Sequence, residues 1–236
     1  MKSKCSECNR VSVVELRYSK RCLCGSCFAG LFEKRFRRGI RTGRLLGKRD
    51  CVVVGLSGCR DSMVLLFLLS RIFFKAPHSR LLALTLDDGN ESRVRIAAGL
   101  CARLGVEHHV RRLDGKLGIY GSLVNGVKAL KGDSLAVGVS LQDEVLFVLD
   151  HVLKGLRFPA GVKGLKVIKP LRECLSEEIE AYARINGIKF LRKGKKVDEF
   201  KALLNDMLDG LEVKQPGIWF KMLKSTDCFR GASGLD

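Results

Sequence analysis

One junction constrains the fold of this chain most: an apolar strand ends in a serine- and glycine-containing loop, and that loop opens a helix. The β-branched run from Val52 to Val54 is typical of a buried strand, and residues 63–69 continue as an apolar helical stretch. Such a junction gathers backbone N–H groups and a positive helix end around one small pocket. Such a pocket favours binding of a phosphate chain. The alternative is a tight strand–helix turn that binds no ligand and contains serines by chance.

The loop between this strand and helix carries several groups suited to phosphate. The hydroxyls of Ser57 and Ser62 add hydrogen-bond donors, and Gly58 lets the backbone approach a ligand closely. The loop is not of the Walker type, because the lysine of G-x-x-x-x-G-K-[ST] is missing. The residues predicted to bind the phosphates of a nucleotide here are Ser57, Gly58, Cys59, Arg60, Asp61 and Ser62.

The length of the chain allows one full domain and a small appendage, since it has 236 residues. Its longest apolar run, 63–69, is much shorter than the roughly 20 residues that cross a bilayer. The first ten residues show no secretory pattern. We therefore expect a soluble, cytoplasmic protein with no membrane partner.

The positive charge is concentrated near the N-terminus. The formal net charge is +18, and residues 1–49, with 14 basic and three acidic side chains, carry +11 of it. This excess predicts a polyanionic partner that docks near that end, with nucleic acid as the first candidate. A basic surface that only keeps the protein soluble is the alternative.

Ten cysteines in an intracellular chain indicate metal or redox chemistry rather than a disulfide framework. The pairs Cys5-x-x-Cys8 and Cys24-x-x-Cys27 are fifteen residues apart, which is a spacing of four-cysteine zinc ribbons. Structural zinc would supply the folding energy that so short a segment lacks. If the second turn is shifted, Cys22 would replace Cys24 as a zinc ligand. The alternative to a zinc site is a set of independent redox-active thiols.

A basic helix is predicted over Phe28–Leu46. Apolar residues recur at helical spacing from Phe28 to Ile40, and the basic side chains lie off this stripe. Such a helix beside a zinc ribbon is typical of a nucleic-acid-binding surface. The alternative is that the basic side chains only form a solvated face of the helix. The residues predicted to bind RNA are Arg35, Arg37, Arg38 and Arg41.

Strands and helices alternate from Cys51 onward. The predicted strands are Cys51–Leu56, Leu81–Leu86, Glu107–Arg112, Ser134–Gly138 and Leu165–Ile168. The predicted helices between and after them are Asp61–Lys75, Glu91–Leu104, Val124–Lys131, Gln142–Leu153 and Ser176–Asn186. Short apolar strands separated by helices predict an α/β fold with a doubly wound parallel sheet.

Ligands of such sheets bind beyond the carboxyl ends of the strands, where the strand order reverses. The loop at Ser57, the turn at Asp87 and Gly138 each follow a predicted strand. We therefore expect Asp87 and Gly138 to join the ATP site at this edge.

The end of the chain is predicted to be helical, over Glu199–Leu211 and Ile218–Leu223. The predicted organisation is a zinc ribbon at 1–28, a basic linker helix at 29–49, an ATP-binding domain at 50–190 and a helical C-terminal tail at 191–236.

Several separated segments resemble one family, the PP-loop ATP pyrophosphatases of cytosolic tRNA 2-thiolation. Ser57–Ser62 is similar to the family's S-G-G-x-D-S loop, with Cys59 at the second glycine. Leu84–Gly89 resembles the strand with the acidic D-E-G turn, and Ile168–Arg172 follows I-K-P-L-R. Weaker matches are the cysteine ribbon, Gly138, Asp143 and Glu144 of a G-H-N-x-D-D-E turn, and Pro216-Gly217-Ile218 with Leu223-Lys224-Ser225 of a P-G-I … L-K-S segment.

The resemblance implies a reaction. ATP would adenylylate the C2 carbonyl of a tRNA uridine and release pyrophosphate, and a sulfur nucleophile would then displace AMP. Asp61 and Asp143 are the implied catalytic carboxylates, with Asp143 as a metal ligand or orienting group. The implied cofactors are ATP, Mg²⁺ and structural Zn²⁺.

The cysteines depart from the family pattern. Active members carry a C-x-x-C before the G-H-N turn and another cysteine after the I-K-P-L-R helix, which hold an iron–sulfur cluster or carry sulfur. Here residues 113–133 and 191–196 contain no cysteine, so the chain is expected to lack an iron–sulfur cluster and to be a diverged member. Cys101 and Cys174 align with neither position and are interpreted as packing residues.

These departures leave three interpretations open. The chain is an ATP-using enzyme of tRNA thiolation that receives sulfur from elsewhere, or a non-catalytic subunit that binds tRNA or a cysteine-complete paralogue. The third, another ATP pyrophosphatase activity on a substrate other than tRNA, is disfavoured by the ribbon and the charge. The expected partners are tRNA and either such a paralogue or a sulfur-carrier protein.

Overall fold

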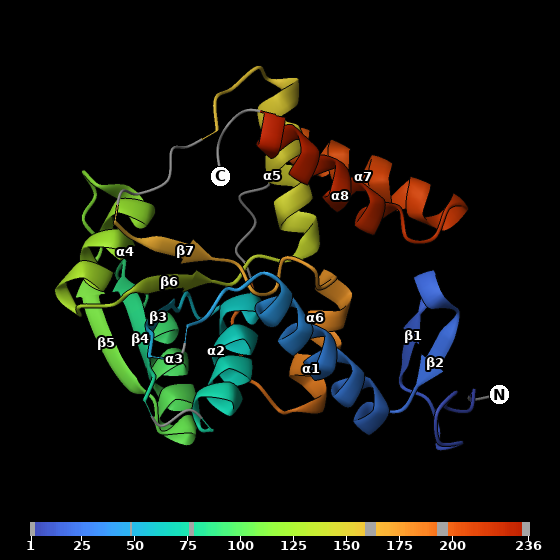
Figure 1. Cartoon of the computed structure of the whole chain (residues 1–236), viewed down its shortest axis with the longest axis horizontal. Coiled ribbons are helices and arrows are strands. Elements are labelled where there is room, and N and C mark those ends of the chain that lie inside the picture. Colours follow the sequence, from blue (N-terminus) through green and yellow to red (C-terminus); the bar gives the residue numbers. More distant parts are fainter. Residues whose placement is uncertain (1–2, 48, 76–77, 159–163, 193–197, 233–236) are drawn as a thin grey trace.

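A five-stranded parallel sheet forms the centre of the chain (Figure 1). The computed structural model describes residues 3–47, 49–75, 78–158, 164–192 and 198–232. The strands are β3 (Cys51–Gly55), β4 (Arg80–Asp87), β5 (Glu107–Arg112), β6 (Ser134–Val137) and β7 (Lys166–Ile168). Their order is β5-β4-β3-β6-β7, so the chain first builds outward from β3 on one side and then returns to build on the other. The order reverses between β3 and β6.

The central strand β3 is buried on both faces, which its β-branched sequence predicted. Val52 and Val54 belong to a core with helices α2 (Arg60–Phe73), α3 (Glu91–Leu104) and α6 (Ser176–Ile185). Val53 points to the opposite face, where it packs with α4 (Gly118–Ala129). Helices therefore cover both faces, and the prediction of a doubly wound parallel sheet is confirmed.

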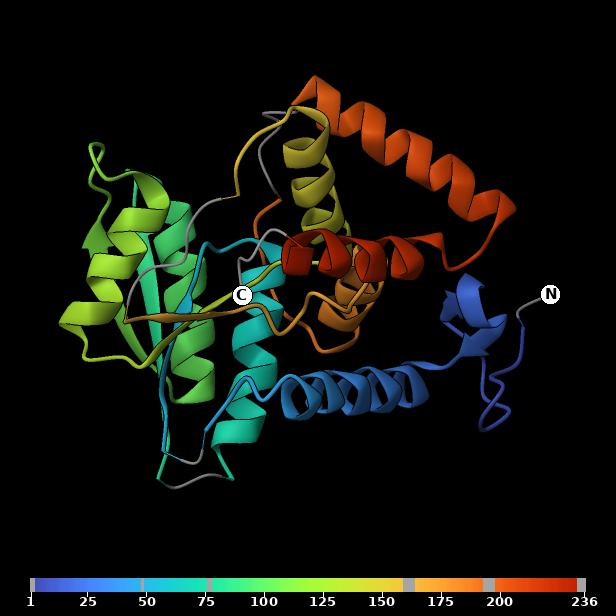
Figure 2. The ribbon, with the colours of Figure 1, turned by 45° about the horizontal axis from the view of Figure 1, so that its top comes forward.

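A small antiparallel hairpin and a long helix precede the sheet. The hairpin pairs β1 (Val14–Leu16) with β2 (Arg21–Leu23) around a single 3-10 turn (Arg17–Ser19). Helix α1 (Gly25–Thr42) follows and leads from the hairpin toward the sheet (Figure 2). It begins three residues before the predicted start, so Cys24 caps the helix and Cys27 lies in its first turn. The predicted apolar stripe is confirmed, because Phe28, Phe32, Phe36 and Ile40 are its buried residues.

The C-terminal segment is helical, as predicted, and packs on α5 (Leu141–Leu153). Helices α7 (Glu199–Lys214) and α8 (Ile218–Ala232) surround a separate core with α5 that contains Val145, Leu208 and Trp219. The indole N–H of Trp219 donates to Asp209 at 3.1 Å. In the part of the chain that the structure describes, none of the helices has the length and apolar character needed to span a bilayer.

Candidate nucleotide and metal sites

The loop that was predicted to bind phosphate joins β3 to α2 at the carboxyl edge of the sheet. Its turn requires a glycine, because Gly58 has a φ of +72°. The hydroxyls of Ser57 and Ser62 lie 3.0 Å apart, and the Ser57 N–H donates to Ser62 Oγ at 3.2 Å. On its other side the loop is held by Leu191, whose N–H donates to the Gly58 carbonyl at 2.8 Å. The loop is therefore fixed in shape before any ligand binds.

Gly138 brings the end of β6 against the first turn of α2. A Cβ built on Gly138 would lie 2.6 Å from the carbonyl carbon of Asp61 and from the backbone nitrogen of Ser62. Contacts below 3.0 Å to backbone atoms cannot be relieved by a side-chain rotation, so only glycine fits here. Two predicted site segments thus meet at the strand-order reversal.

Asp61 is buried in the first turn of α2, with 1% of its surface exposed. Arg60 Nε donates to Asp61 Oδ1 at 2.7 Å, and Arg60 Nη1 lies 3.5 Å from Glu180 Oε2 on α6. A carboxylate at a helix N-terminus is stabilised by the helix dipole. The loop therefore combines hydroxyls, a helix end and one buried carboxylate beside an arginine.

The other two predicted carboxylates occupy different positions at the same edge. Asp87 ends β4, next to β3, and its Oδ1 accepts the N–H of Gly89 at 2.9 Å. Asp143 lies in the first turn of α5, where its N–H donates to Ser140 Oγ at 3.2 Å. Asp143 and Arg60 also line one cavity of about 290 Å³ between the start of α2 and helices α5, α6 and α7. Asp143 thus lies at the same cavity as the start of α2.

Residues around Asp143 form a buried polar network that the sequence pattern did not predict. Gln142 accepts the N–H of Ser176 at 2.8 Å and donates to Glu177 at 3.0 Å. Glu144 is 1% exposed and accepts a hydrogen bond from Lys169 at 2.9 Å. The partners of both residues lie 25 to 35 positions later in the chain, so no local spacing reveals them.

Four cysteines converge at the base of the hairpin. The sulfurs of Cys5, Cys8, Cys24 and Cys27 all lie within 4.8 Å of one another, and Cys8 is 3.5 Å from both Cys24 and Cys27. Cys24, rather than Cys22, completes the group. Among the described residues this is the one group of three or more His, Cys, Asp or Glu side chains that could hold a metal ion.

Hydrogen bonds distribute charge unevenly among these thiols. The Ser26 hydroxyl and the Cys27 N–H lower the pKa of Cys24 to about 6. Crowding by the Cys8 and Cys24 sulfurs raises the pKa of Cys27 to about 12. Thiolates this close repel one another unless a cation holds them, so the donor set fits a bound metal ion.

The cysteines interpreted as packing residues are buried in the core. Cys101 is 1% exposed on α3, and burial raises the pKa of its thiol to about 11. Cys174 is also 1% exposed, and burial raises its pKa to about 12. Both are protonated at neutral pH, so neither is an activated nucleophile.

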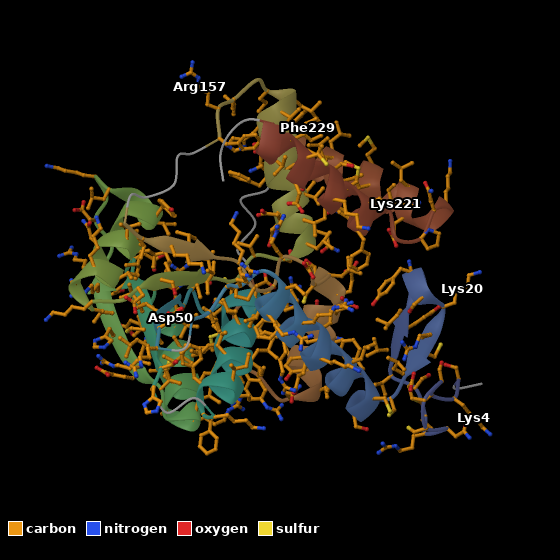
Figure 3. All side chains as sticks on the ribbon, in the orientation of Figure 1. Lys4, Lys20, Asp50, Arg157, Lys221 and Phe229 are labelled. Atoms are coloured by element: carbon orange, nitrogen blue, oxygen red, sulfur yellow. The ribbon has the colours of Figure 1, made fainter. Side chains whose placement is uncertain are left out.

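A basic groove lies between the hairpin and α1. Its volume is about 640 Å³, and Tyr18, Ser19 and Leu31 form its uncharged lining. Its cations are Arg21, Lys34, Arg35, Arg37, Arg38 and Arg41. Arg21 and Lys34 were missed as candidates because Arg21 lies on β2, outside the helical pattern, and Lys34 was assigned only to the charged face. Figure 3 shows Lys20 at the outer end of this hairpin.

Arg35 is not on a solvated face, and this corrects the expectation from the helical pattern. Its side chain is 14% exposed and pairs with Glu178, which is 4% exposed. It also donates to the Tyr18 hydroxyl at 2.8 Å, and that hydroxyl donates to Glu178 at 2.9 Å. The Arg35 guanidinium is therefore the centre of a buried contact between the hairpin, α1 and α6.

Arg37 is half-exposed but already has an acidic partner. Its guanidinium pairs with Glu33 one helical turn earlier, at 2.9 Å. Glu33 also pairs with Arg71 of α2 and accepts the Tyr182 hydroxyl of α6 at 2.8 Å. Arg38 and Arg41, by contrast, are exposed on α1, and among the described residues neither forms an ion pair.

Comparison with known proteins gives consistent relatives, although no protein-family model matches the chain. It is 26% identical to the tRNA-5-methyluridine(54) 2-sulfurtransferase of Pyrococcus horikoshii, over 94% of this chain and 81% of the relative. It is 25% identical to a probable sulfurtransferase of Methanocaldococcus jannaschii, over 92% of this chain and 75% of the relative. It is 26% identical to the tRNA 2-thiolation protein NcsA of Haloferax volcanii, over 78% and 73%.

A solved structure shares the fold over nearly the whole chain. The U34-tRNA thiolase NcsA from Methanococcus maripaludis, solved with its [4Fe-4S] cluster, superposes with a TM-score of 0.81 at 23% identity. The match covers 96% of this chain and 86% of that structure. The relatives that match more than three quarters of this chain are therefore sulfurtransferases and tRNA 2-thiolation proteins of the PP-loop family, and the chain has the fold of NcsA.

Proposed function

We propose that this chain is a cytoplasmic ATP-binding protein that acts on tRNA in uridine 2-thiolation. The observation that carries the proposal is the meeting of the Ser57–Ser62 loop with Gly138 at the strand-order reversal. In the reaction, ATP adenylylates the C2 carbonyl oxygen of the uridine and releases pyrophosphate. A sulfur nucleophile then attacks C2 and displaces AMP.

The residues of the loop suit the first of these steps. The N–H groups at the start of α2 and the hydroxyls of Ser57 and Ser62 bind and orient the phosphates. Asp61 and Asp143 are the carboxylates that would hold Mg²⁺, and the ion would supply positive charge for the pyrophosphate leaving group. Arg60 pairs with Asp61 and lines the same cavity as Asp143.

The four-cysteine group is proposed to hold one zinc ion that has a structural role. A zinc–sulfur distance of about 2.3 Å places tetrahedral sulfurs about 3.8 Å apart. The observed separations of 3.5 Å fit a single ion. A four-iron cluster would place a cube of iron and sulfide between the cysteines and hold their sulfurs farther apart.

The source of sulfur distinguishes two forms of this proposal. In the first, the chain activates the uridine and a sulfur-carrier protein delivers the nucleophile. In the second, the chain is a non-catalytic subunit that holds tRNA for a cysteine-complete paralogue. The segments at 113–133 and 191–196 contain no cysteine and favour a sulfur source outside this chain in both cases.

The basic groove is the proposed docking surface for tRNA. Arg38, Arg41 and Lys34 are exposed there on α1, and Arg21, which pairs with Glu7, lines the groove from the hairpin. Phosphates of the RNA backbone attract such a surface without base contacts. Arg35 is assigned a structural role instead, because Glu178 and Tyr18 already hold it.

Release of pyrophosphate tests the enzymatic form. Purified protein is incubated with ATP, Mg²⁺ and unmodified tRNA, and pyrophosphate is measured with and without the RNA. The proposal expects release that depends on tRNA and is lost in Asp61→Ala. Release that is equal without tRNA would contradict an RNA substrate.

Binding measurements identify the subunit form. If the chain is such a subunit, we expect it to bind ATP and tRNA without releasing pyrophosphate. We also expect it to associate stably with a cysteine-complete paralogue. A protein that binds neither ATP nor tRNA would contradict both forms.

A further inference from the structure

Arg93 lies directly against the phosphate loop, although it follows a different strand. It occupies the first turn of α3, after the turn that ends β4. A Cβ built on Gly58 would meet Arg93 Cγ at 3.2 Å, its carbonyl oxygen at 3.3 Å and its Cα at 3.4 Å. The stem of Arg93 therefore packs on the glycine at the centre of the loop.

The guanidinium of Arg93 has donor capacity that the described residues do not use. Its Nη1 donates to Asp88 Oδ2 at 2.7 Å, and the side chain is 27% exposed. Its Nε is buried and makes no hydrogen bond within the described part of the chain. A buried donor without an acceptor is unfavourable, and the structure must offset that cost.

The position is also electrostatically unfavourable for a cation. The N-terminal end of a helix carries partial positive charge, which repels an arginine in the first turn. Asp88 and Glu91, which lies in the same turn, offset part of this repulsion. An anionic ligand at the loop would offset the rest and satisfy the remaining donors.

We propose that Arg93 is a nucleotide-binding residue whose guanidinium contacts the phosphates of ATP beside Gly58. The inference rests on the proposed ATP site and adds a residue from α3 to it. Arginine suits this role because its planar donors bind phosphate oxygens in pairs. Asp88 is the acceptor of the guanidinium in the free protein, and the phosphates compete with it for the same donors.

Calorimetric titration with ATP and with AMP tests the assignment. Arg93→Ala is expected to weaken ATP binding at least tenfold and AMP binding less than threefold, because AMP lacks the outer phosphates. Arg93→Lys keeps a positive charge and is expected to recover part of the loss. Arg95→Ala removes an exposed arginine from the same helix and is expected to bind both ligands like the wild type.

Asp88→Asn separates binding from support of the turn. If Arg93 binds phosphate, releasing it from Asp88 leaves ATP affinity unchanged or higher. If the ion pair only maintains the turn, Asp88→Asn loses as much affinity as Arg93→Ala, and both ligands are weakened alike. Equal losses in Asp88→Asn and Arg93→Ala, or wild-type ATP affinity in Arg93→Ala, would overturn this inference and leave the proposed ATP site standing. A wild-type protein that binds no ATP would overturn the proposed function and this inference together.

Discussion

At the scale of single residues, the close contact at Gly138 leaves no room for a side chain. A methyl group there would lie 2.6 Å from backbone atoms of Asp61 and Ser62, so Gly138→Ala must push β6 away from α2. We expect a loss of unfolding free energy of about 2 kcal/mol and weaker ATP binding, measured by urea unfolding and calorimetry. Gly99→Ala is the control, because a Cβ built at that helical position meets nothing within 4 Å beyond its chain neighbours and the backbone of its own helix. An unchanged urea midpoint in Gly138→Ala would contradict the close contact.

Arg35 provides the second prediction at this scale. Arg35→Ala leaves Glu178 buried without its cation, and we expect a loss of about 3 kcal/mol in unfolding free energy. Arg38→Ala removes an exposed arginine three residues later and is expected to change stability by less than about 0.5 kcal/mol. Thermal and urea unfolding of both variants measure the difference. Equal unfolding free energies of the two variants would show that the ion pair between Arg35 and Glu178 does not stabilise the fold.

The assignment of Arg35 marks the limit of prediction from sequence for the candidate site. Helical spacing correctly identified which face of α1 is apolar, because that signal is local. The partners of Arg35 are Tyr18, 17 residues before it, and Glu178, 143 residues after it. The loop at Ser57–Ser62 was predictable because strand, turn and helix are consecutive, whereas Arg93 reaches that loop from another strand.

At the scale of elements, we expect the hairpin β1–β2 to depend on a metal ion held by the four-cysteine group. Each strand has only three residues, which is too short for an isolated hairpin to be stable in water. We expect Cys8→Ser to lose the metal and to expose the amides of residues 3–23 to hydrogen exchange, while β3 stays protected. Cys22→Ser is the matched control, since Cys22 lies outside the group and its variant should keep about one zinc ion per chain. Iron in place of zinc would contradict the proposed ion.

The elements of the sheet were predicted closely, and the reason is physical. Strands of a parallel sheet are buried on both faces and therefore appear as short apolar runs between helices.

The bounds of helix α4 were predicted less well. It was predicted to begin at Val124 but begins at Gly118, because Gly118 and Gly121 weaken the helical signal. The hairpin was missed because three-residue strands show no periodicity. Helix α8 extends beyond the predicted end at Leu223.

At the scale of the whole molecule, charge is expected to control RNA binding. Arg38 faces the basic groove, whereas Figure 3 places Arg157 at the top of the view, away from the hairpin at the right. We expect Arg38→Glu to weaken tRNA binding and to reduce the slope of log affinity against log salt by about 1. Arg157→Glu changes the net charge equally and should leave that slope unchanged. Equal slopes in the two variants would remove the groove as the docking surface.

Shielding of Cys59 by ATP tests the central claim, that the nucleotide lies where β3 passes into α2. Cys59 is half-buried in that loop, whereas Cys228 is exposed on α8 and serves as an internal control. Mass spectrometry of the alkylated protein measures both thiols with and without ATP and Mg²⁺. We expect ATP to slow the alkylation of Cys59 and to leave that of Cys228 unchanged. Equal alkylation of Cys59 at saturating ATP would contradict the claim.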